Sequence, residues 1–247
     1  MTYSLDFSAL VPYWPVFLRG AWLTLKMTAV AVVIGTLLGI AVAFIKRARV
    51  PLFSSLCAAY IEVIRNTPFL VQIFVLYFGL ASLEIRMPTF AAAVLAMVVN
   101  IGAYSAEIIR AGLDSIPKGQ IEAAQCLGLS KWRIGWHVML QPALENVYPA
   151  LTSQYLLMMQ ASAMASQISA EELTAIANTV QSDTFRSLET YLVIAALYVT
   201  LSVAIKWVSA LVGRVIVKRT RVLRAARASS VERRAMQVDV AVHGGAA

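Results

Sequence analysis

The sequence predicts an all-α, polytopic membrane protein with five transmembrane helices and a short cytoplasmic helix between the third and the fourth. Two features of composition predict this class: 60% of the 247 residues are hydrophobic, and the mean hydropathy is +0.72. In soluble domains only about half of the residues are apolar. The third observation is a set of five uncharged runs near the roughly 20 residues that cross a bilayer. They are Met27 to Ile45, Asn66 to Leu83, Met87 to Ala106, Asn146 to Ala170 and Thr190 to Ile205.

These runs predict one transmembrane domain, residues 19–213, between an external N-terminal segment, residues 1–18, and a basic cytoplasmic tail, residues 214–247. The fifth run is short, but only Lys206 separates it from a further apolar stretch that ends at Gly213. A lysine near the end of a span can extend its ammonium group to the membrane surface. Met1 to Arg19 lack the pattern of a cleaved signal peptide.

The positions of the basic residues predict the orientation. The formal net charge is +8, but the basic residues gather between the runs, so no nucleic-acid partner is expected. They follow the first, third and fifth runs, at Lys46, Arg47, Arg49, Arg110, Lys118, Lys131, Arg133 and in residues 214–234. The segments after the second and fourth runs are mainly acidic, with Glu84, Glu171, Glu172, Asp183 and Glu189 against Arg86 and Arg186. Basic loops stay in the cytoplasm, which puts the N-terminus in the periplasm and the C-terminus in the cytoplasm.

The cysteines and histidines predict neither a disulfide nor a metal site. Cys57 lies in or near the second span and Cys126 in a cytoplasmic loop, so both are expected to be free thiols. His137 and His243 have no cysteine or carboxylate at metal-ligand spacing.

The second run extends back to Pro51 and carries polar residues beside Pro68. Proline removes a backbone donor and should kink this helix, leaving carbonyl groups near Ile64 that only the protein can satisfy. This region should therefore face the bundle or a wet cavity, which makes Arg65 and Thr67 candidate cavity residues. Glu62 and Arg65 stand at helical i, i+3 spacing, and an ion pair between them is favoured over direct contact with a ligand.

The third run carries a polar stripe, because Asn100, Tyr104 and Glu107 follow one another at i, i+4 and i+7. Asn100 either binds a ligand or joins two helices by a hydrogen bond, and the residues do not decide between these roles. Tyr104 is a further cavity candidate. Glu107 and Arg110 are expected to form an ion pair at the cytoplasmic rim.

The loop between the third and fourth runs has the signals of a short helix outside the membrane. Ser115 and Pro117 mark a start, Gly128 marks a stop, and a second start follows at Ser130. Trp132 and Trp136 are large and apolar enough to hold the loop against the bundle or a partner. By physical chemistry alone, a helix lying on lipid and a helix docking on another protein are equally expected.

Resemblance favours the docking helix. Glu122-Ala123-Ala124, then Gly128, then Leu140 resembles the cytoplasmic coupling motif of ABC importer permeases. Three further segments are similar to the polar amino-acid permeases of that superfamily, over about residues 19–213 in all. They are Tyr60-x-Glu62-x-x-Arg65-x-Thr67-Pro68-x-Leu70-Val71-Gln72, Gly102-Ala103-Tyr104-x-Ala106-Glu107-x-x-Arg110 and Ser115-Ile116-Pro117-x-Gly119-Gln120.

The resemblance implies the type-1 transmembrane fold of ABC importers, in a multi-pass protein of the bacterial inner membrane. Its coupling loop, about residues 111–137, would contact an ATPase through Glu122, Ala123, Ala124 and Gly128. The implied partners are an ATP-binding subunit in two copies, a second permease, identical or homologous, and a periplasmic amino-acid-binding protein. This chain needs no cofactor and is not an enzyme, because ATP and Mg would be bound by the ATPase. The implied substrates are of the histidine, glutamate, glutamine and arginine group.

Two segments depart from the family pattern. The usual Leu-Pro-Gln after the coupling loop reads Leu140-Gln141-Pro142, so the start of the fourth span is expected to bend differently. The family's Lys-Asp-Thr-Ser segment aligns with Gln160-Ala161-Ser162-Ala163, which lacks the charged pair. Gln160 and Ser162 are therefore the candidate cavity residues here. The substitution implies either a different partner permease that holds more ligand contacts or a substrate without net positive charge.

The main alternative is an ion-gradient-driven amino-acid transporter or channel. It predicts acidic residues in mid-span and an internal repeat, and the sequence has neither. The chain also has no Gly-x-x-x-x-Gly-Lys-Ser/Thr phosphate loop, so an ATP-driven mechanism requires a partner.

Overall fold

The computed structural model describes residues 4–48 and 50–216, and these residues form helices and their connections without a strand. The long elements are α1 (Trp14–Ala48), preceded by the 3-10 helix η1 (Ser8–Tyr13), α4 (Thr89–Asp114), α7 (Gln141–Ala161) and α9 (Ser187–Ile216). The shorter ones are α2 (Pro51–Arg65), α3 (Phe69–Ser82), α5 (Lys118–Cys126), α6 (Lys131–Arg133), the π-helical η2 (Ile134–Leu140), η3 (Ser162–Ile168) and α8 (Leu173–Thr184). The all-helical prediction is confirmed for this part of the chain. Most of the predicted tail, from residue 217 onward, lies outside it.

Three described segments are long and apolar enough to cross a membrane: Ser8–Ala48, Thr89–Asp114 and Ser187–Arg214. A fourth is added if α2 and α3 count as one broken span. α7 is not among them, although its 21 residues reach about 32 Å, close to the roughly 30 Å of the hydrocarbon core. α1 begins well before Met27, and α9 continues past Lys206.

The kink predicted at Pro68, in the second run extended back to Pro51, is present as a sharper break between two helices. α2 ends at Arg65, α3 begins at Phe69, and their axes meet at 113°. Pro68 has an extended backbone, with φ −63° and ψ 142°, and it precedes the first residue of α3. Because proline has no N–H to donate, the helix stops here and restarts in a new direction, rather than bending around the proline.

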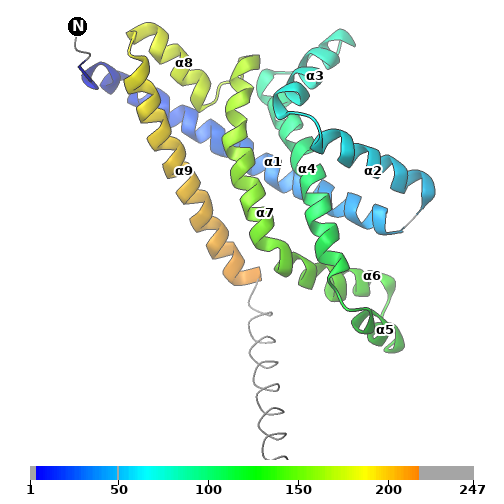
Figure 1. Ribbon diagram of the computed structural model, residues 1–247. Helices are drawn as coiled ribbons and strands as arrows, with labels where there is room; N and C mark the ends of the chain where they lie inside the picture. The colour runs from blue at the N-terminus through cyan, green and yellow to red at the C-terminus, as the bar shows by residue number, and fades with distance from the viewer. Residues whose placement is uncertain (1–3, 49, 217–247) are drawn as a thin grey trace, which may run out of the picture.

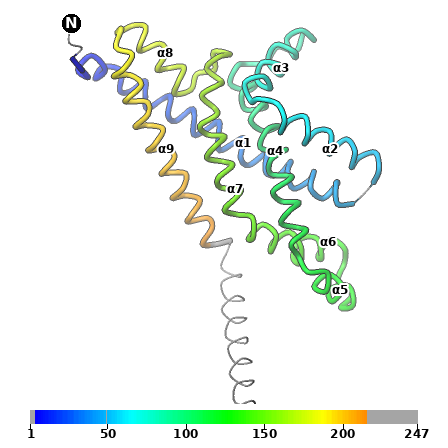
Figure 2. The backbone as a smooth tube through the Cα atoms, in the orientation of Figure 1, coloured from blue at the N-terminus to red at the C-terminus, as the bar shows by residue number. Residues whose placement is uncertain are grey.

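The helices pack around the pair α1 and α4, which cross near the centre of the molecule (Figure 1). α7 packs on α4, and α9 packs on α7 and α8. α5 and α6 lie together at one end, whereas α8 lies toward the other end, beside the N-terminal segment (Figures 1 and 2). The two ends are therefore built differently: one by the loop between α4 and α7, the other by the segment between α7 and α9.

Two glycines allow α1 and α4 to approach closely. A Cβ on Gly39 would lie 2.7 Å from Ser105 Cβ and 3.0 Å from the backbone nitrogen of Ala106. A Cβ on Gly35, one helical turn earlier, would lie 2.8 Å from Ile101 Cβ. Gly-x-x-x-Gly spacing of this kind is typical of close helix pairs in membranes, where packing rather than water exclusion drives association.

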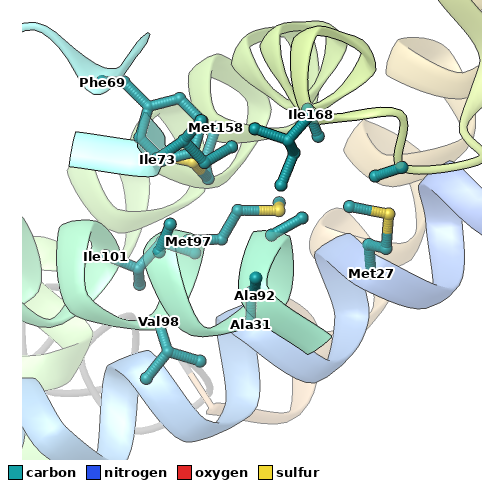
Figure 3. Packing of buried hydrophobic residues seen from close by; sticks show 14 residues of the cluster. Met27, Ala31, Phe69, Ile73, Ala92, Met97, Val98, Ile101, Met158 and Ile168 are labelled. Carbon is teal, nitrogen blue, oxygen red and sulfur yellow. The ribbon is translucent and has the colours of Figure 1, made fainter. Parts of the chain in front are cut away.

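The largest buried cluster joins α1, α3, α4, α7 and η3 beside this crossing (Figure 3). Met97 of α4 lies among side chains from each of the other elements, including Met27, Ile73, Met158 and Ile168. The cluster fixes α3 and η3 against α4. It thereby holds the break between α2 and α3 at the polar stripe of α4.

Candidate functional site

The break between α2 and α3 is closed by the buried side chain of Gln72. Its Nε2 donates to the carbonyl oxygens of Ile64 and Thr67, at 2.7 and 3.0 Å. Ile64 is the residue whose carbonyl would have bonded to position 68 in a continuous helix, so Gln72 replaces the donor that Pro68 lacks. The prediction that the protein itself satisfies this carbonyl is confirmed.

Asn100 connects this break to α4. Its Nδ2 donates to Gln72 Oε1 at 2.8 Å, and its side chain is buried, with 4% exposed. Of the two roles that the sequence left open, the hydrogen bond between helices is therefore present. In the sequence, Gln72 stands out only as part of a family pattern. The signal that could have identified Gln72 is its position in an apolar run, because a buried amide needs hydrogen-bond partners.

Arg65 and Tyr104 meet at the same place. The Arg65 guanidinium carbon lies 5.5 Å from the centre of the Tyr104 ring, which is the geometry of a cation–π contact. The predicted ion pair between Glu62 and Arg65 is wrong, since the ion pairs among the described residues do not include it. Arg65 is the last residue of α2 and turns toward α4, while the Glu62 carboxylate accepts from Asn66 Nδ2 at 2.9 Å.

Four of the predicted cavity residues thus gather where the break faces α4: Arg65, Thr67, Asn100 and Tyr104. Gln160 and Ser162 lie apart from this group, at the junction of α7 and η3. Ser162 is buried and its Oγ donates to Met159 O at 2.6 Å, whereas Gln160 is exposed. In the described part of the chain no hydrogen bond links either residue to Asn100.

The ion pair predicted between Glu107 and Arg110 is confirmed and belongs to a larger network. Lys46 Nζ at the end of α1 lies 3.5 Å from the Glu107 carboxylate. Arg110 also bonds to Asp114 at 2.7 Å, and Arg47 reaches the other Asp114 oxygen at 2.8 Å. The network therefore joins the ends of α1 and α4.

The short helix predicted between the third and fourth runs is α5. Ala124 packs against the bundle with 5% of its surface exposed, while Glu122 and Ala123 face outward. Gly128 has φ +71°, a left-handed conformation that glycine adopts without strain, and the N–H of the following Leu129 donates to Ala124 O. The loop thus presents one face of a well-terminated helix to its surroundings.

The rest of this loop leads into α7 without an interruption. Ser130 begins α6 as predicted, with its Oγ accepting from Arg133 N at 3.4 Å. Ser115, by contrast, ends α4 and donates to Gly112 O, so the start of α5 has no side-chain cap. The rings of Trp132 and Trp136 stack on each other at 6.0 Å and are both exposed.

Glu172 is a buried carboxylate at the opposite end of the molecule. It caps α8: its Oε1 accepts from Ala175 N at 2.7 Å and its Oε2 from the Tyr198 hydroxyl at 2.9 Å. Burial raises the pKa of this carboxyl above its usual range, against the lowering effect of these hydrogen bonds. In the sequence Glu172 contributes only to the acidic character of the segment after the fourth run, because nothing in its spacing indicates burial.

Comparison with known proteins identifies a family. The pattern of the family described as "Binding-protein-dependent transport system inner membrane component" matches residues 35–218. The arginine transport system permease protein ArtQ of Bacillus subtilis (strain 168) is 33% identical over 212 residues, which cover 85% of this chain and 97% of ArtQ. The glutamine transport system permease protein GlnP of Escherichia coli (strain K12) is 32% identical over 205 residues, covering 82% and 94%.

Solved structures agree with this match. The chain is similar to a chain in the crystal structure of an amino acid ABC transporter with histidines, with 38% identity and a TM-score of 0.77. That alignment covers 86% of this chain and 99% of the other. Inward-facing structures of the MetNI methionine ABC transporter share the fold, with a TM-score of 0.71 at 23% identity.

Proposed function

Because the chain belongs to the family of binding-protein-dependent transport system inner membrane components, we propose that it is the permease subunit of an ATP-driven importer of polar amino acids. It is a transport subunit of the inner membrane rather than an enzyme, as its relatives are. The relatives named for arginine and glutamine, and the solved amino acid transporter with histidines, support a polar amino acid as the substrate.

The observation that carries the coupling role is the outward face of α5. Glu122 and Ala123 are exposed, yet the helix is fixed to the bundle through Ala124 and ends sharply at Gly128. A protein docking on this face moves α5, and α5 passes that motion to η2 and α7, which it precedes in the chain. We assign the docking partner as an ATP-binding subunit, present in two copies, which holds ATP and Mg.

The transport cycle would be alternating access between two permeases. The broken pair α2 and α3 and the polar stripe of α4 line the cavity, with Arg65, Thr67, Asn100 and Tyr104 on this chain. Gln160 and Ser162 complete the proposed lining from the junction of α7 and η3. The second permease is identical or homologous, and a periplasmic binding protein delivers the amino acid. The lack of a charged pair at residues 160–163 favours either a distinct partner permease or a substrate without net positive charge.

We propose five crossings, made by α1, the broken pair α2 and α3, α4, α7 and α9. The length of α7 supports its inclusion. Basic residues lie near α5 and near the end of α9, which puts both on the same side of the membrane. The chain must therefore cross an even number of times between them, and α7 and α9 provide two crossings. The N-terminus is then periplasmic and the C-terminus cytoplasmic.

The decisive experiment measures ATP-dependent amino-acid uptake by the complete importer in proteoliposomes. Glu122→Ala and Gly128→Val should each abolish uptake while the chain still inserts in the membrane, because both residues lie outside the spans. The matched control is Gly119→Ala, also on α5, where an added Cβ meets nothing within 4 Å. Uptake at the wild-type rate in both variants would refute the coupling role of α5.

Copurification tests the proposed partners. The tagged chain should bring down an ATPase from membranes, and mass spectrometry then shows whether a second, different permease comes with it. An ATPase with two kinds of permease supports the heterodimer, and an ATPase with this chain alone supports the homodimer. Recovery of no ATPase, together with uptake driven by an ion gradient, would instead support the alternative transporter class.

A further inference from the structure

A polar pocket of about 750 Å³ lies at the end of the molecule where α1 and α4 end. Its charged and polar walls are Lys46 and Arg47 of α1, Ser54 of α2, Arg110 and Asp114 of α4, and Lys118 of α5. Four separate helices thus contribute to one pocket. None of its lining residues belongs to the break that faces Asn100, whereas Lys118 lies one helical turn before Glu122, so the pocket adjoins the outward face of α5.

The pocket has an excess of positive charge. Its four cations, Lys46, Arg47, Arg110 and Lys118, are opposed by two carboxylates, Asp114 in the pocket and Glu107 beside it. The carboxylates already bond to the first three of these cations. Among the described residues no carboxylate oxygen lies within 4 Å of Lys118 Nζ. Within the described ranges, Lys118 therefore brings a charge that has no ion-pair partner.

The start of α5 adds to this positive potential. Lys118 is the first residue of this nine-residue helix, which has no side-chain cap at its N-terminus. The Gln120 N–H donates to Pro117 O, but the N–H groups before it in the first turn, and the helix dipole, favour an anion nearby. Lys118 is exposed and thus places its ammonium group at the positive end of the helix dipole.

The surface next to the pocket is apolar. The first turns of α2, which provide Ser54, expose Leu52, Phe53 and Leu56 to 67%, 58% and 59%. The pocket also lies at the ends of α1 and α4, two of the segments apolar enough to cross a membrane. A ligand that fits this surface carries an anionic group for the pocket and hydrocarbon for α2.

We propose that this pocket binds the phosphate group of an anionic phospholipid, with the acyl chains lying along Leu52, Phe53 and Leu56 of α2. The phosphate oxygens bond to Lys118 and to the N–H groups at the start of α5, while Lys46 and Arg47 remain paired at the pocket wall. A bound lipid at this position ties α5 to the ends of α1 and α4. The site depends on membrane insertion and not on the transported substrate.

The test measures which lipids stay bound to the purified importer. The complete assembly is extracted from membranes that contain phosphatidylglycerol and phosphatidylcholine, and the retained lipids are counted by mass spectrometry. Lys118→Gln should retain about fivefold less phosphatidylglycerol, from the roughly 1 kcal/mol that one lysine contributes near a charged surface. Lys131→Gln removes the same charge from the exposed helix α6 and should retain lipid as the wild type does.

A second pair of variants keeps the test independent of Lys118. Ser54→Glu puts a carboxylate into the pocket and should also abolish the preference for phosphatidylglycerol, whereas Ser55→Glu, on the exposed neighbouring position, should not. Equal retention in all variants would overturn the site. If inorganic phosphate protects the assembly equally without any anionic lipid, the pocket binds free phosphate and the lipid assignment is wrong.

Discussion

At the scale of single residues, the amide of Gln72 on α3 joins this helix to α2 and to α4. It accepts from Asn100 and donates to two carbonyl groups at the break, all inside the bundle. Gln72→Leu keeps a similar volume but leaves these groups without partners, and each buried unpaired group costs about 1–3 kcal/mol. We expect a marked loss of stability, measured as the thermal unfolding of the purified assembly in detergent.

The control for this prediction is Gln167→Leu. Gln167 is exposed on η3, so this substitution makes the same chemical change at the surface. It should unfold within a few degrees of the wild type. If Gln72→Leu is as stable as Gln167→Leu, then water or other groups satisfy the break, and the amide of Gln72 does not hold it.

Glu172 provides a pH-dependent contribution to stability. Burial raises the pKa of this carboxyl above the 4.5 that is usual for glutamate, so the folded protein holds this proton more firmly than the unfolded chain does. Its contribution to the free energy of unfolding is therefore largest below pH 4.5 and is lost as the pH rises through the raised pKa. Glu172→Gln should remove this part of the pH dependence when unfolding is measured across that range. A profile identical to that of the wild type would contradict this role.

At the scale of elements, the contact between α1 and α4 depends on the absence of side chains. Gly39→Val places new atoms against Ser105 and the backbone of Ala106, so the two helices must separate. Overpacking of this kind costs about 1–3 kcal/mol. The yield of folded assembly and its unfolding temperature should both fall. Gly79→Val on α3 is the matched control, because an added Cβ there meets nothing within 4 Å, and equal losses in both variants would contradict the argument.

The sequence predicted elements whose signals are local. The short helix α5 was predicted by its glycine stop, and the interruption of the second run by Pro68, because a missing N–H acts within one turn. The 113° angle was not predicted, since it depends on Gln72 and on packing against α4. Local spacing also favoured a pair between Glu62 and Arg65. The structure instead places Arg65 against Tyr104, a residue far away in the sequence.

The same distinction applies to the candidate site. The stripe of Asn100 and Tyr104 follows from helical periodicity alone, and both residues do face the break. The hydrogen bond from Asn100 to Gln72 joins positions 28 apart, so no local pattern indicates it. The burial of Glu172 likewise depends on contacts of α8 with α1 and α9. Helical periodicity thus identified the polar face of a helix, but it did not identify the helix against which that face packs.

At the scale of the whole molecule, charge and architecture give the same polarity. The end that holds α5 also carries Lys46, Arg47 and Arg110, whereas the end that holds α8 carries Glu171 and Glu172 (Figure 1). Positive charge is retained on the cytoplasmic side of membranes. In the proposed orientation, the docking face of α5 and the basic pocket lie at the cytoplasmic end, where an ATPase and the inner surface of the membrane are both within reach.

This polarity is tested by labelling single cysteines with a membrane-impermeant maleimide. In a Cys57→Ser background, the exposed Cys126 at the end of α5 should react in inside-out vesicles stripped of peripheral proteins, but not in intact spheroplasts. With both native cysteines replaced by serine, Ser182→Cys on the exposed surface of α8 should react in the opposite way. Because α5 and α8 lie at opposite ends of the molecule, labelling of both from the same side would require a different path of the chain through the bilayer. Reversed labelling of the pair would invert the proposed orientation and remove α5 from the reach of a cytoplasmic ATPase.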